Sequence, residues 1–424
     1  MLNQKFNLSA GSTKFNHERR LMLFDLSIYG HHSSYIRHLI KYWSEKELPG
    51  SLDIVVSPQF MQEHSDVASL PAKYDLKNVN FVAVDPAEEA ALKSRKTGLS
   101  RTVRAFQEWE IFCKYADNLK STQALLLYFD TCLLPLAFGR NAPCAFSGIY
   151  FRPTFHYSDF TNYLPSRKDR IQQQREKYIL SRVLHNSQLQ TLFCLDPFVV
   201  KHFNKFRTKV EAVHLPDPVQ IHHESVQSNS LKEKLGIQSD KQVLLLFGAL
   251  DGRKGIHQLL EAVTLLPPEL LKKLCLVFIG ESHPVERALI ETQVLAVCQS
   301  HPIQIVRHYE FVPEQDVAAY FQLADVVLAP YQRHVGMSGI LLLAAAAQKP
   351  VLSSNYGLMG EIVQKYSLGI TIDSTLPSGI ANGLTQFLLA SPDRLCDHSK
   401  MKLFSEQNSA ERFAATIFQC LLAQ

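Results

Sequence analysis

The sequence RHVGMSGILLLAAAAQKPV, residues 333–351, combines a glycine turn, an apolar run and the start of a strand. Gly336 and Gly339 allow the backbone to approach a ligand closely. Ser338 suits the N-cap position of a helix from about Gly339 to Ala347, and this helix is apolar on every side, so we expect it to be buried. Its N-terminus would offer free amides and the positive end of the helix dipole to a phosphate. The alternative is a packed core helix that follows a glycine turn.

Length and composition narrow the class of protein. The chain has 424 residues, enough for two or three domains, and is 46% hydrophobic and 20% charged, as in ordinary globular proteins. A net charge of +4 is too small to predict nucleic-acid binding. The 8 cysteines form no CxxC pair, which argues against a zinc site or a disulfide framework and indicates a cytoplasmic protein. No apolar run approaches the ~20 residues of a membrane-spanning helix.

The first half of the chain alternates buried strands with helices. Gly30 is a turn after the first strand, and Ile36, Leu39, Ile40 and Trp43 recur at helical spacing. This alternation predicts a parallel sheet with helices on both faces. The predicted strands are 21–29, 51–57, 79–84, 123–130 and 189–196, and the other predicted helices are 101–119 and 167–186.

The pattern breaks and then restarts. Two prolines around Asp217 and a polar run after them predict a domain boundary near Pro218. We therefore expect two doubly wound α/β domains, with a ligand in the cleft that they face. The strands predicted for the second domain are 241–250, 274–280, 303–309, 325–331, 350–354 and 369–373, and its helices are 256–266, 283–299 and 313–324.

Six stretches, in order, resemble the family-four, or group 1, glycosyltransferases of the GT-B fold. HLPDPV resembles the interdomain hinge, and FGALDGRKGIHQLLEA and LVFIG resemble the start of the donor domain. YEFVPEQDVAAYFQLADVVLAPY and GMSGILLLAAAAQKPVLSSNYGLMGEIV are similar to the base-contacting segment and the donor loop with its helix. NSAERF resembles the start of the closing C-terminal helix. The resemblance covers roughly residues 205–424.

This resemblance implies a GT-B architecture of two Rossmann-like domains that face a cleft. It implies a flexible tail at 1–20, an acceptor domain at 21–218, a donor domain at 219–400 and a final helix at 401–424 that packs back on the first domain. It further implies transfer of a hexose from a nucleotide-sugar donor to a carbohydrate or lipid acceptor, with retention at the anomeric carbon, no metal and no cofactor.

The leaving diphosphate needs fixed positive charge and amide donors. Lys254 matches the phosphate lysine of the family, and Arg253 stands beside it in the loop DGRKG, at the carboxyl end of a predicted strand. The alternative is a solvated basic turn. Together with this loop, the predicted diphosphate site contains Gly336, Ser338 and Gly339, and the predicted base site contains Phe311 and Val312, which are otherwise ordinary residues at a strand end.

The sequence departs from the family at two acids. The family carries a Glu, seven residues and a second Glu, where this chain has Val335 and Leu343. In the family these acids contact the donor sugar and the ribose hydroxyls, so the departure affects donor identity and raises the alternative of an inactive protein. Glu310 and Glu361 are candidates to contact the donor sugar or ribose, unless they are solvated charges.

The first domain offers acceptor-side candidates in its strand-to-helix loops. Gly30, His31 and His32 follow the first strand, and we assign His31 as a catalytic candidate and Gly30 and His32 to acceptor binding. Asp130 ends a buried strand and is the second catalytic candidate, as a carboxylate that orients the acceptor. Arg152 lies in the aromatic stretch FSGIYFRPTFHY and is a candidate to bind a phosphate or carboxylate of the acceptor. The alternative for the loop with the two histidines is a surface loop without a function. Asp130 could instead be an N-cap, and the stretch around Arg152 could be a rigid packed loop.

Three other functions stay open. A non-catalytic relative that binds a nucleotide or a glycan fits the loss of both glutamates, and a GT-B sugar epimerase fits the same fold. A dinucleotide dehydrogenase fits poorly, because no GxGxxG motif follows the first strand.

The basic clusters KSRKTGLSR and RKDR are either solvated charge or a means of peripheral attachment to the inner membrane face.

Overall fold

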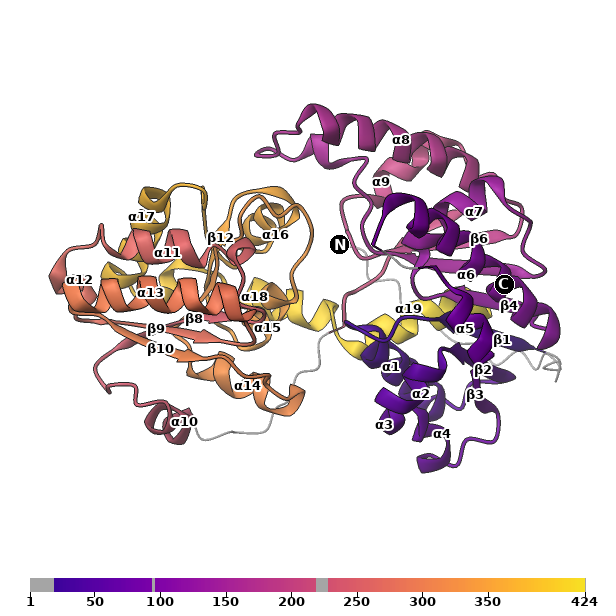
Figure 1. The fold of residues 1–424 in the computed structure, drawn as a ribbon, viewed down its shortest axis with the longest axis horizontal. Helices are drawn as coiled ribbons and strands as arrows, with labels where there is room; N and C mark the ends of the chain where they lie inside the picture. The colour runs from indigo at the N-terminus through magenta and orange to yellow at the C-terminus, as the bar shows by residue number, and fades with distance from the viewer. Residues whose placement is uncertain (1–18, 94–95, 219–227, 424) are drawn as a thin grey trace.

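The structure, a computed structural model, describes residues 19–93, 96–218 and 228–423 and consists of two α/β lobes (Figure 1). In these residues the first lobe has a seven-stranded parallel sheet of order β3-β2-β1-β4-β5-β6-β7. Its strands are β1 (Arg20–Asp25), β2 (Ser51–Val56), β3 (Val79–Ala83), β4 (Gln123–Leu126), β5 (Ala145–Tyr150), β6 (Leu189–Cys194) and β7 (Glu211–His214). The order reverses direction between β1 and β4, which is where ligands bind in such sheets.

Helices cover both faces of this sheet (Figure 1). This lobe has two clusters of buried apolar side chains. In one, the long helix α6 packs Trp109 and Phe112 against Phe146 of β5, and in the other, α1 contributes Ile36 and Leu39. The helices are α1 (His32–Glu45), α2 (Pro58–Glu63), α3 (Ser65–Ala68), α4 (Leu70–Lys73), α5 (Pro86–Ala91), α6 (Gly98–Asn118), α7 (Leu133–Phe138), α8 (Arg167–Val183) and α9 (Val200–Phe203).

The second lobe repeats the design. Its described strands form a six-stranded parallel sheet of order β10-β9-β8-β11-β12-β13, which reverses between β8 and β11. The strands are β8 (Gln242–Phe247), β9 (Leu274–Ile279), β10 (Gln304–His308), β11 (Val326–Ala329), β12 (Val351–Ser354) and β13 (Gly369–Ile372). Every residue of β9 is buried, as expected for a strand covered on both faces.

The helices of the second lobe include the one predicted from the opening sequence. α15 spans Gly339–Ala346, within one residue of the prediction, and is buried among the core side chains. The others are α10 (Ser228–Lys234), α11 (Ile256–Val263), α12 (Pro268–Leu271), α13 (Pro284–Ser300), α14 (Glu314–Leu323), α16 (Gly357–Tyr366), α17 (Pro377–Leu389) and α18 (His398–Gln407).

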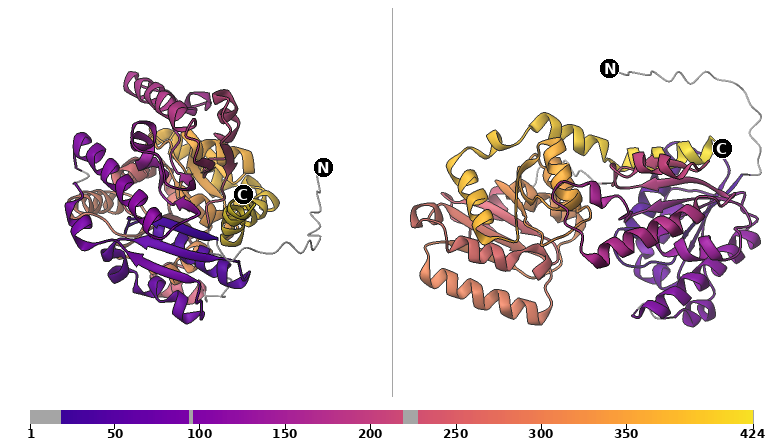
Figure 2. Two further views of the ribbon diagram at one scale, coloured as in Figure 1. Left: turned by 90° about the vertical axis from the view of Figure 1, so that its right-hand side faces the viewer. Right: turned by 90° about the horizontal axis from the view of Figure 1, so that it is seen from above.

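The last helix, α19 (Ala410–Leu422), returns to the first lobe (Figures 1 and 2). Its Phe413 and Ile417 are fully buried in the core cluster of that lobe, and the Phe413 ring lies 4.7 Å from the ring of Tyr35 in α1. The Tyr35 hydroxyl donates to Asp217, 2.7 Å away, in the hinge sequence LPDP. The last helix is therefore packed on the first lobe, and a hydrogen bond joins α1 of this lobe to the hinge.

Some expectations fall outside the described residues or miss an element. Residues 1–18 of the predicted tail are not described, and Arg20 already begins β1. The predicted boundary at Pro218 adjoins the undescribed residues 219–227, so its position stays a prediction. The pattern did not predict the strands β5 and β7 or the helices α16 and α17. In the described part of the chain, no helix has the length and apolar character that crossing a bilayer requires.

Replacing Phe413 with alanine tests the return of α19. The buried phenyl ring would leave a cavity, so we expect Phe413→Ala to lower the free energy of unfolding by about 3–5 kcal/mol in a denaturant titration. Leu389→Ala, at a side chain that is 72% exposed, should change it by less than about 0.5 kcal/mol. Equal small effects of both substitutions would contradict the docked position of α19.

Candidate active site

Lys254 occupies the switch point of the second sheet, in the loop after β8. The residue is only 6% exposed, and its ammonium donates to the carbonyl oxygen of Phe247 at the end of β8. The ammonium also lies 5.1 Å from the centre of the Tyr331 ring, which follows β11. Among the described residues no carboxylate forms an ion pair with Lys254. A buried cation with one carbonyl partner is costly unless an anion joins it, so the position favours an anionic ligand.

Two glycines make room for this lysine. Gly248 has a φ of +97°, and a Cβ atom there would lie 2.8 Å from Nζ of Lys254. Gly255 has a φ of +74°, and a Cβ atom there would lie 2.1 Å from the carbonyl oxygen of Pro330. At each position the positive φ disfavours a residue with a side chain, and a Cβ atom would also collide with its neighbour, so glycine is required. The turn between β8 and α11 is thus built so that Lys254 reaches the end of β11.

Arg253 is the second cation of this loop. Its guanidinium lies 5.6 Å from the centre of the Tyr331 ring and 3.7 Å from Asp251. Its side chain is 49% exposed, so the ion pair with Asp251 is weak in water. Arg253 therefore remains available to a ligand beside Lys254.

The N-terminus of α15 lies beside the same tyrosine. Ser338 holds the N-cap position, as predicted, but its side chain does not cap the helix, because its hydroxyl pairs with the Tyr331 hydroxyl 2.9 Å away. In the described chain no protein acceptor takes up the amides of Ser338, Gly339 or Ile340. A Cβ atom at Gly339 would meet nothing within 4 Å, so internal packing does not require glycine there. The free amides and the open space suit an anion.

The residues at the two departures from the family are apolar and partly buried. Val335 and Leu343 both pack against the core of the second lobe, and the Val335 carbonyl accepts a hydrogen bond from Leu358. The predicted base-site residues differ from each other, since Phe311 is 70% exposed while Val312 is buried. Glu310 is 82% exposed on its side chain and contacts only His308 among described groups, at 3.8 Å.

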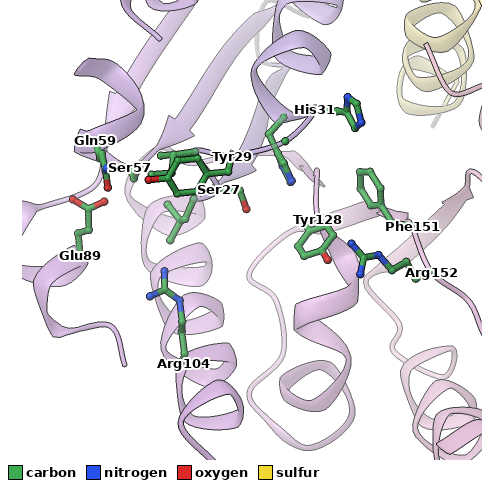
Figure 3. Close-up of a pocket in the computed structure, with 14 residues that line it drawn as sticks. Ser27, Tyr29, His31, Ser57, Gln59, Glu89, Arg104, Tyr128, Phe151 and Arg152 are labelled. Carbon is green, nitrogen blue, oxygen red and sulfur yellow. The ribbon is translucent and has the colours of Figure 1, made fainter. Parts of the chain in front are cut away.

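The first lobe contains a pocket of about 510 Å³ at its own switch point (Figure 3). Loops after β1, β2, β4 and β5 line it, and they include Gly30, His31 and His32. Arg104 of α6 and Arg152, which follows β5, reach it from its other side (Figure 3). The structure thus brings the three predicted acceptor-binding residues, Gly30, His32 and Arg152, into one pocket.

His32 is the oriented histidine of the pair. Its Nδ1 atom contacts the buried carboxylate of Asp25 at the end of β1, and the second carboxylate oxygen accepts from the Ser27 amide at 2.9 Å. The ring packs against Tyr128 and Phe151, with centroids 5.4 and 6.1 Å away. His32 lines the pocket, and a donor role for Nδ1 leaves Nε2 as an acceptor.

His31 has no such support. It is exposed, stacks on Tyr35 at 6.4 Å and makes no side-chain cap for α1. Its catalytic assignment stays a prediction. Sequence reasoning missed Asp25, although an acid that ends the apolar run LMLFD is the same signal that drew attention to Asp130.

Asp130 uses both carboxylate oxygens to hold the backbone after β5. They accept the amides of Phe151 at 2.8 Å and Arg152 at 2.9 Å. Burial raises the pKa of Asp130 to about 6, while the two amides and the Arg152 charge oppose this rise. Asp130 therefore positions Arg152, which is a structural role that does not require contact with an acceptor.

Charged residues of both candidate sites affect the pKa of His334. Burial lowers the pKa of His334 in the loop after β11, and the charges of Arg253, Arg152 and Lys254 lower it further. The Thr161 amide of the first lobe donates to Glu361 of α16 at 3.1 Å. Glu361 thus joins the lobes in this structure, and the charge of Arg152 in the first lobe acts on His334 of the second. No group of three metal-ligating side chains occurs within the described ranges.

Comparison with known proteins agrees with this geometry. The sequence model of the family described as glycosyl transferases group 1 matches residues 227–417. The lipopolysaccharide 1,2-N-acetylglucosaminetransferase of Salmonella typhimurium is 28% identical over 194 residues, which are 44% of this chain and 50% of that protein. The chain spans about half the length of the curated relatives it matches.

Solved structures match over nearly the whole chain. Sucrose-phosphate synthase of Thermosynechococcus elongatus has a TM-score of 0.66 at 16% identity, covering 96% of this chain and 98% of that one. Anabaena HepE in complex with UDP has a TM-score of 0.64 at 12% identity, covering 96% and 100%.

The fold is therefore the GT-B fold, as predicted. Within it, residues 227–417 match the group 1 glycosyltransferase family model.

The raised pKa of Asp130 predicts a pH dependence of stability. Below the unfolded pKa of 3.8 the side chain is protonated in both states, and above about pH 6 it is ionised in both. The native state binds the proton more tightly, so this contribution to the free energy of unfolding should fall by on the order of 2 kcal/mol as the pH rises from 4 to 6. The difference between wild type and Asp130→Asn should change over that range in chemical denaturation and be constant above it. A difference that is flat from pH 4 to 8 would contradict the raised pKa.

Proposed function

We propose that this chain transfers a hexose from a nucleotide-sugar donor to a carbohydrate or lipid acceptor. The observation that carries the proposal is the buried ammonium of Lys254, which has no acidic partner among the described residues and lies beside the free amides of α15. Fixed cations and amides of this kind stabilise the charge that develops on a leaving diphosphate. Arg253, Gly336, Ser338 and Gly339 complete the diphosphate site, and Phe311 and Val312 flank the base. Glycosyltransferases are among the sequence relatives, and one of the similar solved structures is a complex with UDP, which supports this assignment.

The acceptor occupies the pocket of the first lobe in this proposal. His32, held by Asp25, binds the acceptor beside the hydroxyl that attacks, and Gly30 lets the acceptor approach the backbone. Arg152 lies close enough to the other lobe to act on His334, which supports placing the acceptor next to the donor sugar. Transfer proceeds with retention, without a metal or cofactor, and the departing phosphate takes the proton. The chain acts in the cytoplasm and attaches peripherally to the inner membrane face through its basic segments.

A second candidate is a non-catalytic protein that binds a nucleotide or glycan. The apolar side chains Val335 and Leu343 favour it, because neither can bind a hydroxyl. Release of nucleoside diphosphate from a panel of nucleotide-sugars with sugar and lipid acceptors separates the two functions. Transfer supports the enzyme, and nucleotide binding without turnover supports the second candidate.

Lys254→Ala tests the diphosphate site. A nucleoside diphosphate at a hundred times its dissociation constant stabilises the folded state by about 2.7 kcal/mol. We expect a thermal-shift screen to find such a ligand for the wild type, and Lys254→Ala to lose most of the shift. Lys402→Ala, at a side chain that is 74% exposed in α18, should keep it. A full shift in the Lys254 variant would contradict the site.

The stereochemical course has its own measurement. The anomeric configuration of the fresh product, read by proton NMR of the anomeric coupling, should equal that of the donor. An inverted product would refute the retaining course and leave the diphosphate site intact.

A further inference from the structure

A second hollow continues from the acceptor pocket, between α6 and α8. It has a volume of about 920 Å³ and shares Arg104, Tyr128 and Arg152 with the first pocket. We call this hollow the α6–α8 groove. Its apolar lining includes Leu133, Leu134 and Ile171. The groove therefore extends the acceptor site within the first lobe.

Cations from three elements line the α6–α8 groove. Arg101 comes from α6, Arg152 follows β5, and Lys168 and Arg175 come from α8. Within the described residues, none of these four side chains forms an ion pair. On α8 the lining positions 168, 171, 172, 175 and 179 follow helical spacing, so one face of this helix is turned to the groove.

The acids that line the same groove are already engaged. Glu108 pairs with Arg104 at 2.6 Å. Asp130 holds the amides of Phe151 and Arg152. Glu176 accepts from the Tyr150 hydroxyl at 2.6 Å and from the Thr154 amide at 2.8 Å. Asp130 and Glu176 keep their negative charge in these contacts, so the groove lining carries five cations, including Arg104, against three acids and has a net positive charge.

We propose that the α6–α8 groove binds a phosphate group of the acceptor, which makes this protein specific for phosphate-bearing acceptors. Guanidinium groups bind phosphate through paired hydrogen bonds, and four cations around one groove raise the local concentration of an anion. Arg152 lies in both pockets, so the phosphate binds beside the hydroxyl that reacts. The inference rests on the proposed function for the role of the acceptor, but the anion site itself does not require transfer. The phosphate belongs to a sugar phosphate or to a lipid, and the experiment distinguishes these sources.

The experiment measures binding to the full chain while a saturating nucleoside diphosphate fills the donor site. Glucose 6-phosphate is the soluble probe, with glucose as its neutral match, and calorimetry gives the dissociation constants. Phosphatidylcholine vesicles with and without phosphatidic acid are the lipid probe, read by co-sedimentation. The variant is Arg101→Ala/Arg175→Ala, at exposed positions that do not contribute to the core. The matched control is Arg167→Ala/Arg170→Ala, which removes the same charge from exposed positions on α8 outside the groove lining.

We expect one phosphate probe to bind at least about tenfold more tightly than its neutral match, and the groove variant to lose about tenfold while the control stays within about twofold. Binding of glucose 6-phosphate identifies a sugar phosphate, and binding of the phosphatidic acid vesicles alone identifies a lipid phosphate. No preference for either phosphate probe overturns the proposal. Equal losses in the groove and control variants also overturn it, because general surface charge then explains the binding.

Failure of the groove and failure of the proposed function give different results. The nucleoside diphosphate shift should persist in the groove variant, since Arg101 and Arg175 lie in the first lobe. A chain that shows no nucleotide shift but binds the phosphate probe through Arg101 and Arg175 would lack the proposed donor site and keep the anion site. A normal nucleotide shift without phosphate selectivity would refute the groove alone.

Discussion

The buried ammonium of Lys254 is the group on which the arrangement of the second lobe depends. A cation taken out of water needs compensation, and the protein supplies one carbonyl and the face of Tyr331. Gly248 and Gly255 have no side chains because Lys254 and Pro330 occupy that space. The Tyr331 carbonyl accepts from Ser374 at 2.8 Å, and its hydroxyl pairs with Ser338. Tyr331 thereby connects the cationic turn to the N-terminus of α15.

The first lobe uses its switch point in a different way. Its polar groups are oriented by two carboxylates: the buried Asp25 holds His32, and the partly buried Asp130 holds the backbone that carries Arg152. The second lobe offers cations and amides without acids, which suits a diphosphate. The first offers an oriented imidazole and arginines, which suits a hydroxyl and an anion. The contact between Thr161 and Glu361, with the return of α19, keeps the two sets on facing sides of one molecule.

Sequence patterns predicted most of the fold because both sheets are buried and parallel. Runs such as LCLVFI are apolar throughout, and α15 ended within one residue of its predicted bound. The edge strand β7 was missed, since none of its residues is buried and no apolar run marks it. The sequence predicted the positions of several site residues in the fold, but not the groups that these residues contact. Spacing placed Ser338 at the N-cap, yet its bond to Tyr331 and the pairing of Asp25 with His32 depend on tertiary contacts that no local pattern encodes.

Amide hydrogen–deuterium exchange with and without UDP reports on the backbone groups that hold the diphosphate in the proposed donor site. We predict slower exchange on addition of UDP in the peptides that cover Gly336–Ile340 and the loop 251–255, with the wild-type chain at saturating nucleotide. Unchanged exchange in both segments, with nucleotide binding established by calorimetry, would place the diphosphate elsewhere and contradict the account.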